Sequence, residues 1–219
     1  MTRDAVATRL MRTPVWVQAL VVYALSRLLT LTIVASAAQH QGETPWNGPD
    51  GPSVIEYLNF WDAGWYERVW KDGYPAPLPL REDGSVAQNA WAFYPLYPWF
   101  VGALCSVTGL EFKTLAVVTS VVCAGAASVV ILYLFRKFAD PAQALTGLAF
   151  FLVFPATATL MSGYAEAMAI LFLAVALWLI AQRRYLLAIP AVVLMDVTRP
   201  IGVGFSFFML IHLLWRWLG

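Results

Sequence analysis

An aspartate set among aromatic side chains is the residue of this sequence best suited to proton transfer. Asp62 stands in the segment FWDAGWYERV, directly after Trp61. A carboxylate beside rings that can stack on a sugar and exclude water suits a general base. A solvated loop carboxylate or a helix cap is the simpler interpretation of the same residue. The segment therefore supplies a candidate base, and its candidate substrate contacts are Trp61, Trp65 and Tyr66.

Charged side chains next to or within apolar stretches form a second group of candidates. Glu166 opens an apolar run, where an acid also fits the first turn of a helix. Arg199 follows Asp196 by three residues, so it either forms an ion pair there or holds an anionic lipid phosphate. Arg27 interrupts the first apolar run, where snorkelling or pairing would accommodate it. Ionisable groups at membrane depth are costly and often functional, which makes Glu166 and Arg199 candidate substrate-binding residues.

The aromatic and proline-rich segment QNAWAFYPLYPW marks a point where the chain returns to an apolar environment. An interfacial aromatic belt explains such a segment, and we apply that explanation to Trp91 and Trp99. Tyr94 and Tyr97 could instead line a groove for a lipid-linked substrate. Both tyrosines are therefore candidate substrate contacts.

Metal and cofactor chemistry have no support in the sequence. His40 and His212 lie far apart without ligand spacing, and Cys105 and Cys123 both lie in apolar runs. Glycine-rich phosphate loops, serine-centred elbows and CxxC pairs are absent. We expect neither a metal nor a cofactor.

The composition indicates which elements must position these residues. Of 219 residues, 60% are hydrophobic and 12% charged, whereas soluble domains carry roughly 25% charged residues. An ordinary soluble domain is excluded. We expect an all-α, polytopic transmembrane protein with about 5–7 membrane segments of about 20 residues each, in a single domain over residues 1–219. A net charge of +1 without a Lys/Arg cluster excludes nucleic-acid partners.

The first apolar run, residues 14–38, follows the basic residues Arg3, Arg9 and Arg12. The positive-inside rule then places Met1 in the cytoplasm and the chain after Ala38 outside. The small residues 35–37 resemble a signal-peptidase site, but the run is longer than that of a signal peptide. We favour an uncleaved membrane anchor.

Residues 39–90 form the expected extracytoplasmic loop. Eight acidic and three basic residues give it a net charge of −5, and it is rich in aromatic residues such as Trp46. This composition argues against a disordered linker. Apolar residues recur at helical spacing from Val54 to Trp70, which predicts a membrane-surface helix with a break near residues 61–64.

Further apolar stretches follow at about 91–110, 114–135, 141–163, 167–182, 185–195 and 200–215. If all of them span, the basic pairs at 136–137 and 183–184 share a side with the acidic loop, against the positive-inside rule. If 91–110 only dips into the outer leaflet, those pairs return to the cytoplasm. We favour this second topology, which brings residues 162–166 and Arg199 to the side of Asp62. The stretch 185–195 is too short to cross about 30 Å of hydrocarbon, so the helix should break near Arg199.

Four blocks of the sequence resemble PIG-V-type mannosyltransferases, the family that includes the second mannosyltransferase of glycosylphosphatidylinositol anchor synthesis and its bacterial relatives. The blocks are FWDAGWYERVWKDGY, AFYPLYPWFVGAL, SGYAEAMAILFLAVALWLIAQRRYLLA and DVTRPIG. The resemblance implies a GT-C fold and identifies Asp62, in the first extracytoplasmic loop, as the catalytic base. The serine that precedes the glutamate in the family is Ala165 here. Usual members are substantially longer, which leaves three interpretations open: a truncated chain, half of a split enzyme that a second membrane subunit completes, or a non-catalytic relative.

The resemblance also implies a reaction. A glycosyltransferase of this kind moves a sugar, here mannose, with inversion from a polyprenyl-phosphate donor to a lipid or glycan acceptor on the extracytoplasmic face. Arg199 would then stabilise the leaving phosphate. The alternative is a non-catalytic membrane scaffold or partner subunit of a lipid-handling or glycosylation complex. A transporter half is disfavoured because the sequence has no convincing internal repeat.

Overall fold

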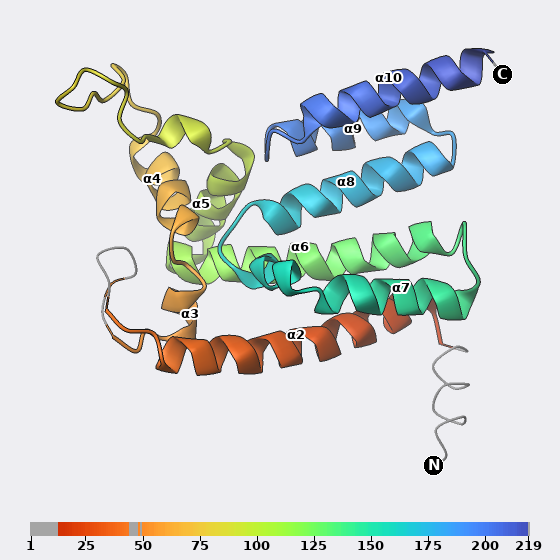
Figure 1. Cartoon of the computed structure of the whole chain (residues 1–219), viewed down its shortest axis with the longest axis horizontal. Helices are drawn as coiled ribbons and strands as arrows, with labels where there is room; N and C mark the ends of the chain where they lie inside the picture. The colour runs from red at the N-terminus through yellow and green to blue at the C-terminus, as the bar shows by residue number, and fades with distance from the viewer. Residues whose placement is uncertain (1–12, 44–47, 49, 219) are drawn as a thin grey trace.

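The computed structural model describes residues 13–43, 48 and 50–218, and helices dominate it (Figure 1). Helices make up 72% of the structure, and the described residues contain no β-strand. The all-α class is therefore confirmed. The predictions that concern Met1, Arg3, Arg9, Arg12 and Trp46 lie outside the described residues.

The elements follow one another along the chain as α2 (Val15–Gln39), α3 (Val54–Tyr57), α4 (Asp62–Asp72), η1 (Ala90–Ala92), α5 (Leu96–Thr108), α6 (Phe112–Phe135), α7 (Pro141–Val153), η2 (Pro155–Met161), α8 (Glu166–Ala181), α9 (Tyr185–Asp196) and α10 (Gly202–Leu218). Helix α6 lies at the centre, in contact with α2, α7 and α8. Helix α9 covers α8, and α10 covers α9 (Figure 1).

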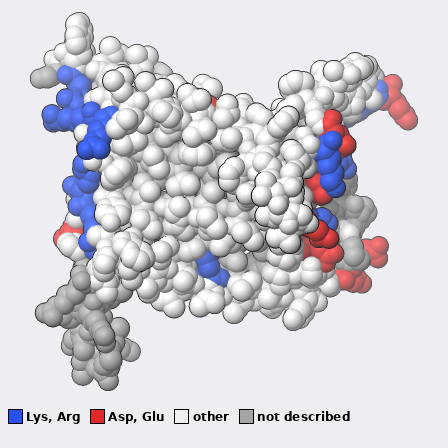
Figure 2. All heavy atoms as spheres, turned by 180° about the vertical axis from the view of Figure 1, so that it is seen from behind, with Lys and Arg blue, Asp and Glu red and all other residues white. Residues whose placement is uncertain are grey.

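The long helices run between two ends of this bundle. We call the end formed by residues 50–111, 162–166 and 196–201 the loop end, because α3, α4 and α5 gather there (Figure 1). The opposite end, formed by residues 13–14, 136–141 and 182–185, is the basic end. Lys and Arg side chains gather at the basic end, whereas the loop end carries Asp and Glu together with some Lys and Arg, and the broad surface between the two ends is mostly uncharged (Figure 2). That distribution suits a body whose middle lies in hydrocarbon.

Two described helices, α2 and α6, are long and apolar enough to cross a membrane. The bent pair α7 and η2 makes a third candidate if it counts as one span, whereas α5, α8, α9 and α10 are shorter apolar helices. The structure therefore gives two to three candidate spans by length and composition, against the 5–7 segments expected from the sequence.

The predicted stretch 141–163 is not one continuous helix. Its axis bends by 76° between α7 and η2. Pro155 causes the break, because the residue before a proline avoids the α-helical region, and Phe154 accordingly has a ψ of 134°. The break leaves backbone carbonyls without helical partners in an apolar region, and these need other donors.

Arg27 supplies those donors. Its guanidinium donates from Nη1 to the Thr157 carbonyl at 2.8 Å and from Nη2 to the Leu152 carbonyl at 2.7 Å. Only 6% of Arg27 is exposed, and the Leu152 carbonyl also accepts from the Thr157 hydroxyl at 2.9 Å. A cation at the carboxyl end of α7 is favourable for its dipole. Arg27 therefore neither snorkels nor pairs with a carboxylate: it caps a broken helix.

The helix break expected near Arg199 is present. Helix α9 ends at Asp196 and α10 begins at Gly202, so Arg199 lies in the intervening loop. The Leu96 N–H donates to the Val197 carbonyl at 3.0 Å and ties this loop to the start of α5. Helix α5 thus begins and ends at the loop end, and does not run the length of the bundle.

We predict that Arg27→Met lowers the stability of the fold by about 2–5 kcal/mol, because two buried carbonyls each lose a donor. Arg27→Lys should recover part of the loss, since an ammonium can still donate to one of the two. Thermal denaturation of the purified chain in detergent measures the change. Thr32→Val, on an exposed position of the same helix, is the control. Equal melting temperatures for Arg27→Met and wild type would contradict this role.

Candidate active site

The candidate base opens a helix at the loop end. Asp62 is the first residue of α4, and Trp61 precedes it as the N-cap residue. The predicted break near 61–64 therefore falls slightly earlier, at residues 58–61, between α3 and α4. The Asp62 side chain is exposed, as access to a substrate requires.

Trp61 has an unusual backbone conformation, with φ 54° and ψ −110°. These angles suit glycine, because a Cβ is strained there. The Trp61 side chain is also 69% exposed. Strained backbone conformations cluster at functional sites. Trp61 combines such a conformation with an exposed ring next to the carboxylate of Asp62.

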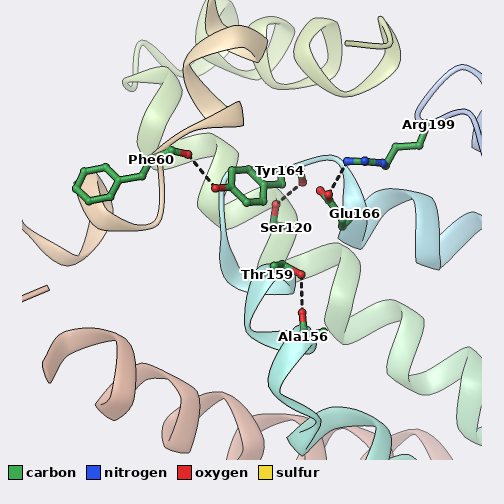
Figure 3. A network of polar contacts seen from close by, with 7 residues as sticks. All are labelled: Phe60, Ser120, Ala156, Thr159, Tyr164, Glu166 and Arg199. Atoms are coloured by element: carbon green, nitrogen blue, oxygen red, sulfur yellow. Dashed lines mark hydrogen bonds and ion pairs between the residues drawn. The ribbon is translucent and has the colours of Figure 1, made fainter. Parts of the chain in front are cut away.

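Tyr164 connects this strained turn to the bundle. Its hydroxyl donates to the Phe60 carbonyl, on the peptide group before Trp61, at 2.9 Å. The Tyr164 carbonyl in turn accepts from the Ser120 hydroxyl of α6 at 3.0 Å (Figure 3). The backbone adds a second link, since the Gly163 N–H donates to the Leu58 carbonyl at 2.9 Å. Residues 58–62 are thereby held by the segment that leads into α8.

Gly163 allows the close approach of these two segments. A Cβ at this position would collide with the Asn59 side-chain oxygen and come within 3.1 Å of the Ala116 Cβ. Asn59 is itself fixed, because its Nδ2 donates to the carbonyls of Ile55 and Lys113 at 2.8 and 3.1 Å. Glycine is therefore required at position 163 for space.

Glu166 and Arg199 form an ion pair across two segments that are distant in sequence. The Nη1 of Arg199 lies 2.5 Å from Oε1 of Glu166 (Figure 3). The other carboxylate oxygen of Glu166 is buried and has no partner among the described residues. The ion-pair partner of Arg199 is therefore Glu166 and not Asp196, the partner that the sequence suggested. The guanidinium keeps further N–H groups for an anion.

The charges of Asp62 and Glu166 act on the same two tyrosines. Burial raises the pKa of Tyr164 to about 12, and the negative charges of Asp62 and Glu166 add to the shift. Burial also raises the pKa of Tyr66, helped by Glu166 and Asp62 and opposed by Arg199. Three segments of the chain therefore bring one carboxylate, one ion pair and two protonated hydroxyls into a single electrostatic environment.

Several aromatic candidates serve packing in this structure. Tyr97 is 0% exposed, and its hydroxyl donates to the Ala116 carbonyl at 2.9 Å, so it does not line a groove. Tyr66 is buried edge-on against Phe93 and Tyr97. Trp65 is stacked on Phe93 at 5.7 Å.

Trp65 also has the Arg68 guanidinium over its ring, at 4.7 Å from the ring centre. Tyr94 is half-buried and makes no hydrogen bond with the described residues. Among the candidates for stacking on a sugar, Trp61 therefore offers the most accessible ring.

Two apolar hollows reach this site. The first, of about 260 Å³, lies between the end of α2, α3 and η2, and Trp61, Tyr164 and Ser162 line its polar side. The second, of about 570 Å³, lies on the break between α7 and η2 and has Glu166 in its wall. Thr159 lines both hollows, so η2 separates them.

Sequence reasoning missed the positioning residues. Tyr164, Ser120 and the Phe60 carbonyl form the network in Figure 3. A serine within an apolar helix was the available signal, but hydroxyls of this kind often bond to their own helix. The described residues contain no cluster of three or more His, Cys, Asp or Glu side chains suited to a metal ion.

We predict that Trp61→Gly keeps or raises the melting temperature of the chain, because glycine adopts positive φ without strain. Trp61→Ala should lower it, since alanine keeps the strain and loses the contacts of the ring. Thermal unfolding of both variants in the same detergent makes the comparison. A Trp61→Gly variant less stable than Trp61→Ala would show that position 61 is not strained.

No family model matches the chain, and searches of curated proteins and of solved structures return no match.

Proposed function

We propose that the chain is a membrane glycosyltransferase, or half of one, which transfers a sugar from a polyprenyl-phosphate donor to an acceptor at the loop end of the bundle. Mannose is the sugar that the family resemblance implies. The convergence of Asp62, Trp61 and the Glu166–Arg199 pair at this end carries the proposal. These residues come from three separate parts of the chain.

The reaction needs one proton acceptor and one stabilised leaving group. Asp62 takes the proton of the acceptor hydroxyl as its oxygen attacks the anomeric carbon from the face opposite the phosphate. The bond between that carbon and the phosphate oxygen breaks, and the oxygen keeps the electron pair. The configuration at carbon inverts, and the products are the glycosylated acceptor and the lipid phosphate. General-base assistance of this kind contributes roughly 10²- to 10⁴-fold.

Arg199 is suited to the leaving phosphate. Glu166 fixes one edge of its guanidinium, which limits the conformations that the long side chain must give up on binding. The remaining N–H groups form paired, charge-assisted hydrogen bonds with phosphate oxygens. Glu166 is therefore a positioning residue in this proposal, and Arg199 contacts the donor.

The apolar hollows favour lipid-linked substrates over soluble ones. One contains Trp61, the neighbour of the proposed base, and the other contains Glu166, the partner of the phosphate-binding arginine. Isoprenoid and acyl chains gain about 0.8 kcal/mol for each CH₂ group buried in such surroundings. A lipid chain lying in either hollow would deliver its headgroup to the site.

The proposed membrane arrangement has about 5–7 segments, in which α2, α6, the α7–η2 pair and α8 cross, the shorter helices α9 and α10 form one segment broken near Arg199, and α5 does not cross. The loop end is extracytoplasmic and the basic end cytoplasmic. The gathering of Lys and Arg at one end supports this orientation (Figure 2). The N-terminus is then cytoplasmic.

We predict that Asp62→Asn lowers mannosyl transfer by about 10²- to 10⁴-fold, because an amide cannot accept the proton. The assay follows radiolabelled mannose from polyprenyl-phosphate-mannose into lipid or glycan acceptors of membranes that contain the full chain and any native partner. Asp72→Asn is the matched control, since Asp72 is an exposed aspartate at the far end of the same helix. Undiminished transfer by a well-expressed Asp62→Asn variant would eliminate Asp62 as the base.

We predict that cysteines at Ser85 and Val107 react with an impermeant maleimide added outside intact cells. A cysteine at Gln143 should react only after permeabilisation. All three positions are exposed, the first two at the loop end and the third near the basic end. Cys105→Ser and Cys123→Ala provide the unreactive background. Labelling of Gln143→Cys in intact cells would reverse the orientation.

A further inference from the structure

Two pairs of cations meet at the basic end. Arg136 and Lys137 follow the last residue of α6, and Arg183 and Arg184 occupy the turn between α8 and α9. We call these residues the basic cluster. The Lys137 Nζ donates to the carbonyl of Ala181, the last residue of α8, at 3.0 Å, which places the two pairs side by side. Lys and Arg side chains form a blue band along one end in Figure 2.

The basic cluster has no carboxylate partner among the described residues. Asp140 is the acidic residue nearest in sequence, and its side chain caps α7, accepting from the N–H groups of Ala142 and Gln143 at 2.9 and 3.0 Å. The described ion pairs, Lys71–Glu67 and Arg199–Glu166, both involve residues of the loop end. The positive charge of the basic cluster therefore lacks a counter-ion within the described chain.

Helix capping does not explain the two arginines of the turn. The Arg183 and Arg184 N–H groups donate to the carbonyls of Ile180 and Leu179 at 2.8 and 2.9 Å. This is the hydrogen-bond pattern that closes a helix with a left-handed residue, a position that usually holds glycine. Arg183 occupies it with φ 63°. The backbone completes the cap, and both arginine side chains are exposed and make no hydrogen bond or ion pair with the described residues.

An arginine where glycine would be less strained indicates that its side chain is needed. We propose that the basic cluster binds the phosphate of an anionic phospholipid headgroup. The cluster lies where apolar helices end, which in the proposed membrane arrangement is the depth of a headgroup layer, and arginine presents paired donors that match phosphate oxygens. A lipid would bring the missing negative charge together with chains that fit the exposed apolar surfaces of the helices. This site is independent of the proposed catalytic function.

The test measures lipid preference in the purified chain. The melting temperature is compared in nanodiscs of phosphatidylcholine alone and with phosphatidylglycerol, and retained lipid is counted by native mass spectrometry. We expect phosphatidylglycerol to stabilise the wild type. Arg183→Gly combined with Arg184→Gln should weaken retention about 30-fold, because each cation near an anionic surface contributes about a factor of five. Arg183→Gly should leave the fold stable in phosphatidylcholine, since glycine suits the left-handed position.

Two exposed cations far from the basic cluster provide the control: Arg81 belongs to the loop end, and Lys113 lies next to it in the first turn of α6. Arg81→Gln combined with Lys113→Gln removes the same charge and should leave the effect of phosphatidylglycerol unchanged. Arg183→Lys with Arg184→Lys should keep most of it. Equal stabilisation of the Arg183→Gly, Arg184→Gln variant by phosphatidylglycerol would overturn the proposal. Stabilisation of the wild type by inorganic phosphate to the same extent would assign the cluster to a soluble anion instead and would equally overturn it.

Discussion

Backbone polar groups that water cannot reach must find partners inside the protein, and this constraint organises the bundle. The chain contains a helix break at Phe154 and another after Asp196, and each frees carbonyls in an apolar region. At the first break, Arg27 and Thr157 supply the missing donors. At the second, the loop shares a backbone hydrogen bond with α5 and carries Arg199. Polar side chains are therefore concentrated at the two helix breaks, where the backbone alone cannot satisfy its hydrogen bonds.

The sequence predicts much of this fold, because its strongest signals are local. Apolar run lengths and Pro200 are sufficient to predict the break between α9 and α10. The same rule applied to Pro155 would have divided the stretch 141–163, but the uninterrupted hydrophobicity around it suggested a single helix. The role of Arg27 could not be predicted from the sequence, because its partners are backbone carbonyls 125 and 130 residues away. Every residue has such a carbonyl, so residue types do not identify the partners.

The residues of the candidate site also differ in how well the sequence identifies them. Asp62, Glu166 and Arg199 are conspicuous because charges are rare in this chain, and the structure brings them to one end. The aromatic residues carry less information, since a ring that packs and a ring that stacks on a substrate look alike in sequence. Burial decides between them: Tyr97 is enclosed in the core, whereas Trp61 remains accessible. Strain adds a second criterion, because the two non-glycine residues with positive φ among those described, Trp61 and Arg183, lie at the two proposed contact surfaces.

The tight space at Gly163 has a genetic consequence. Any missense change in a glycine codon introduces at least a Cβ, and at this position that atom would meet Asn59 and Ala116. Substitution would therefore separate the turn that carries Trp61 and Asp62 from the segment before α8, while the apolar contacts between α6, α8 and α9 remain intact. Such an allele would alter the geometry of the candidate site at a distance from its charged side chains. The position of the candidate base thus depends on a residue that itself has no side chain to contribute.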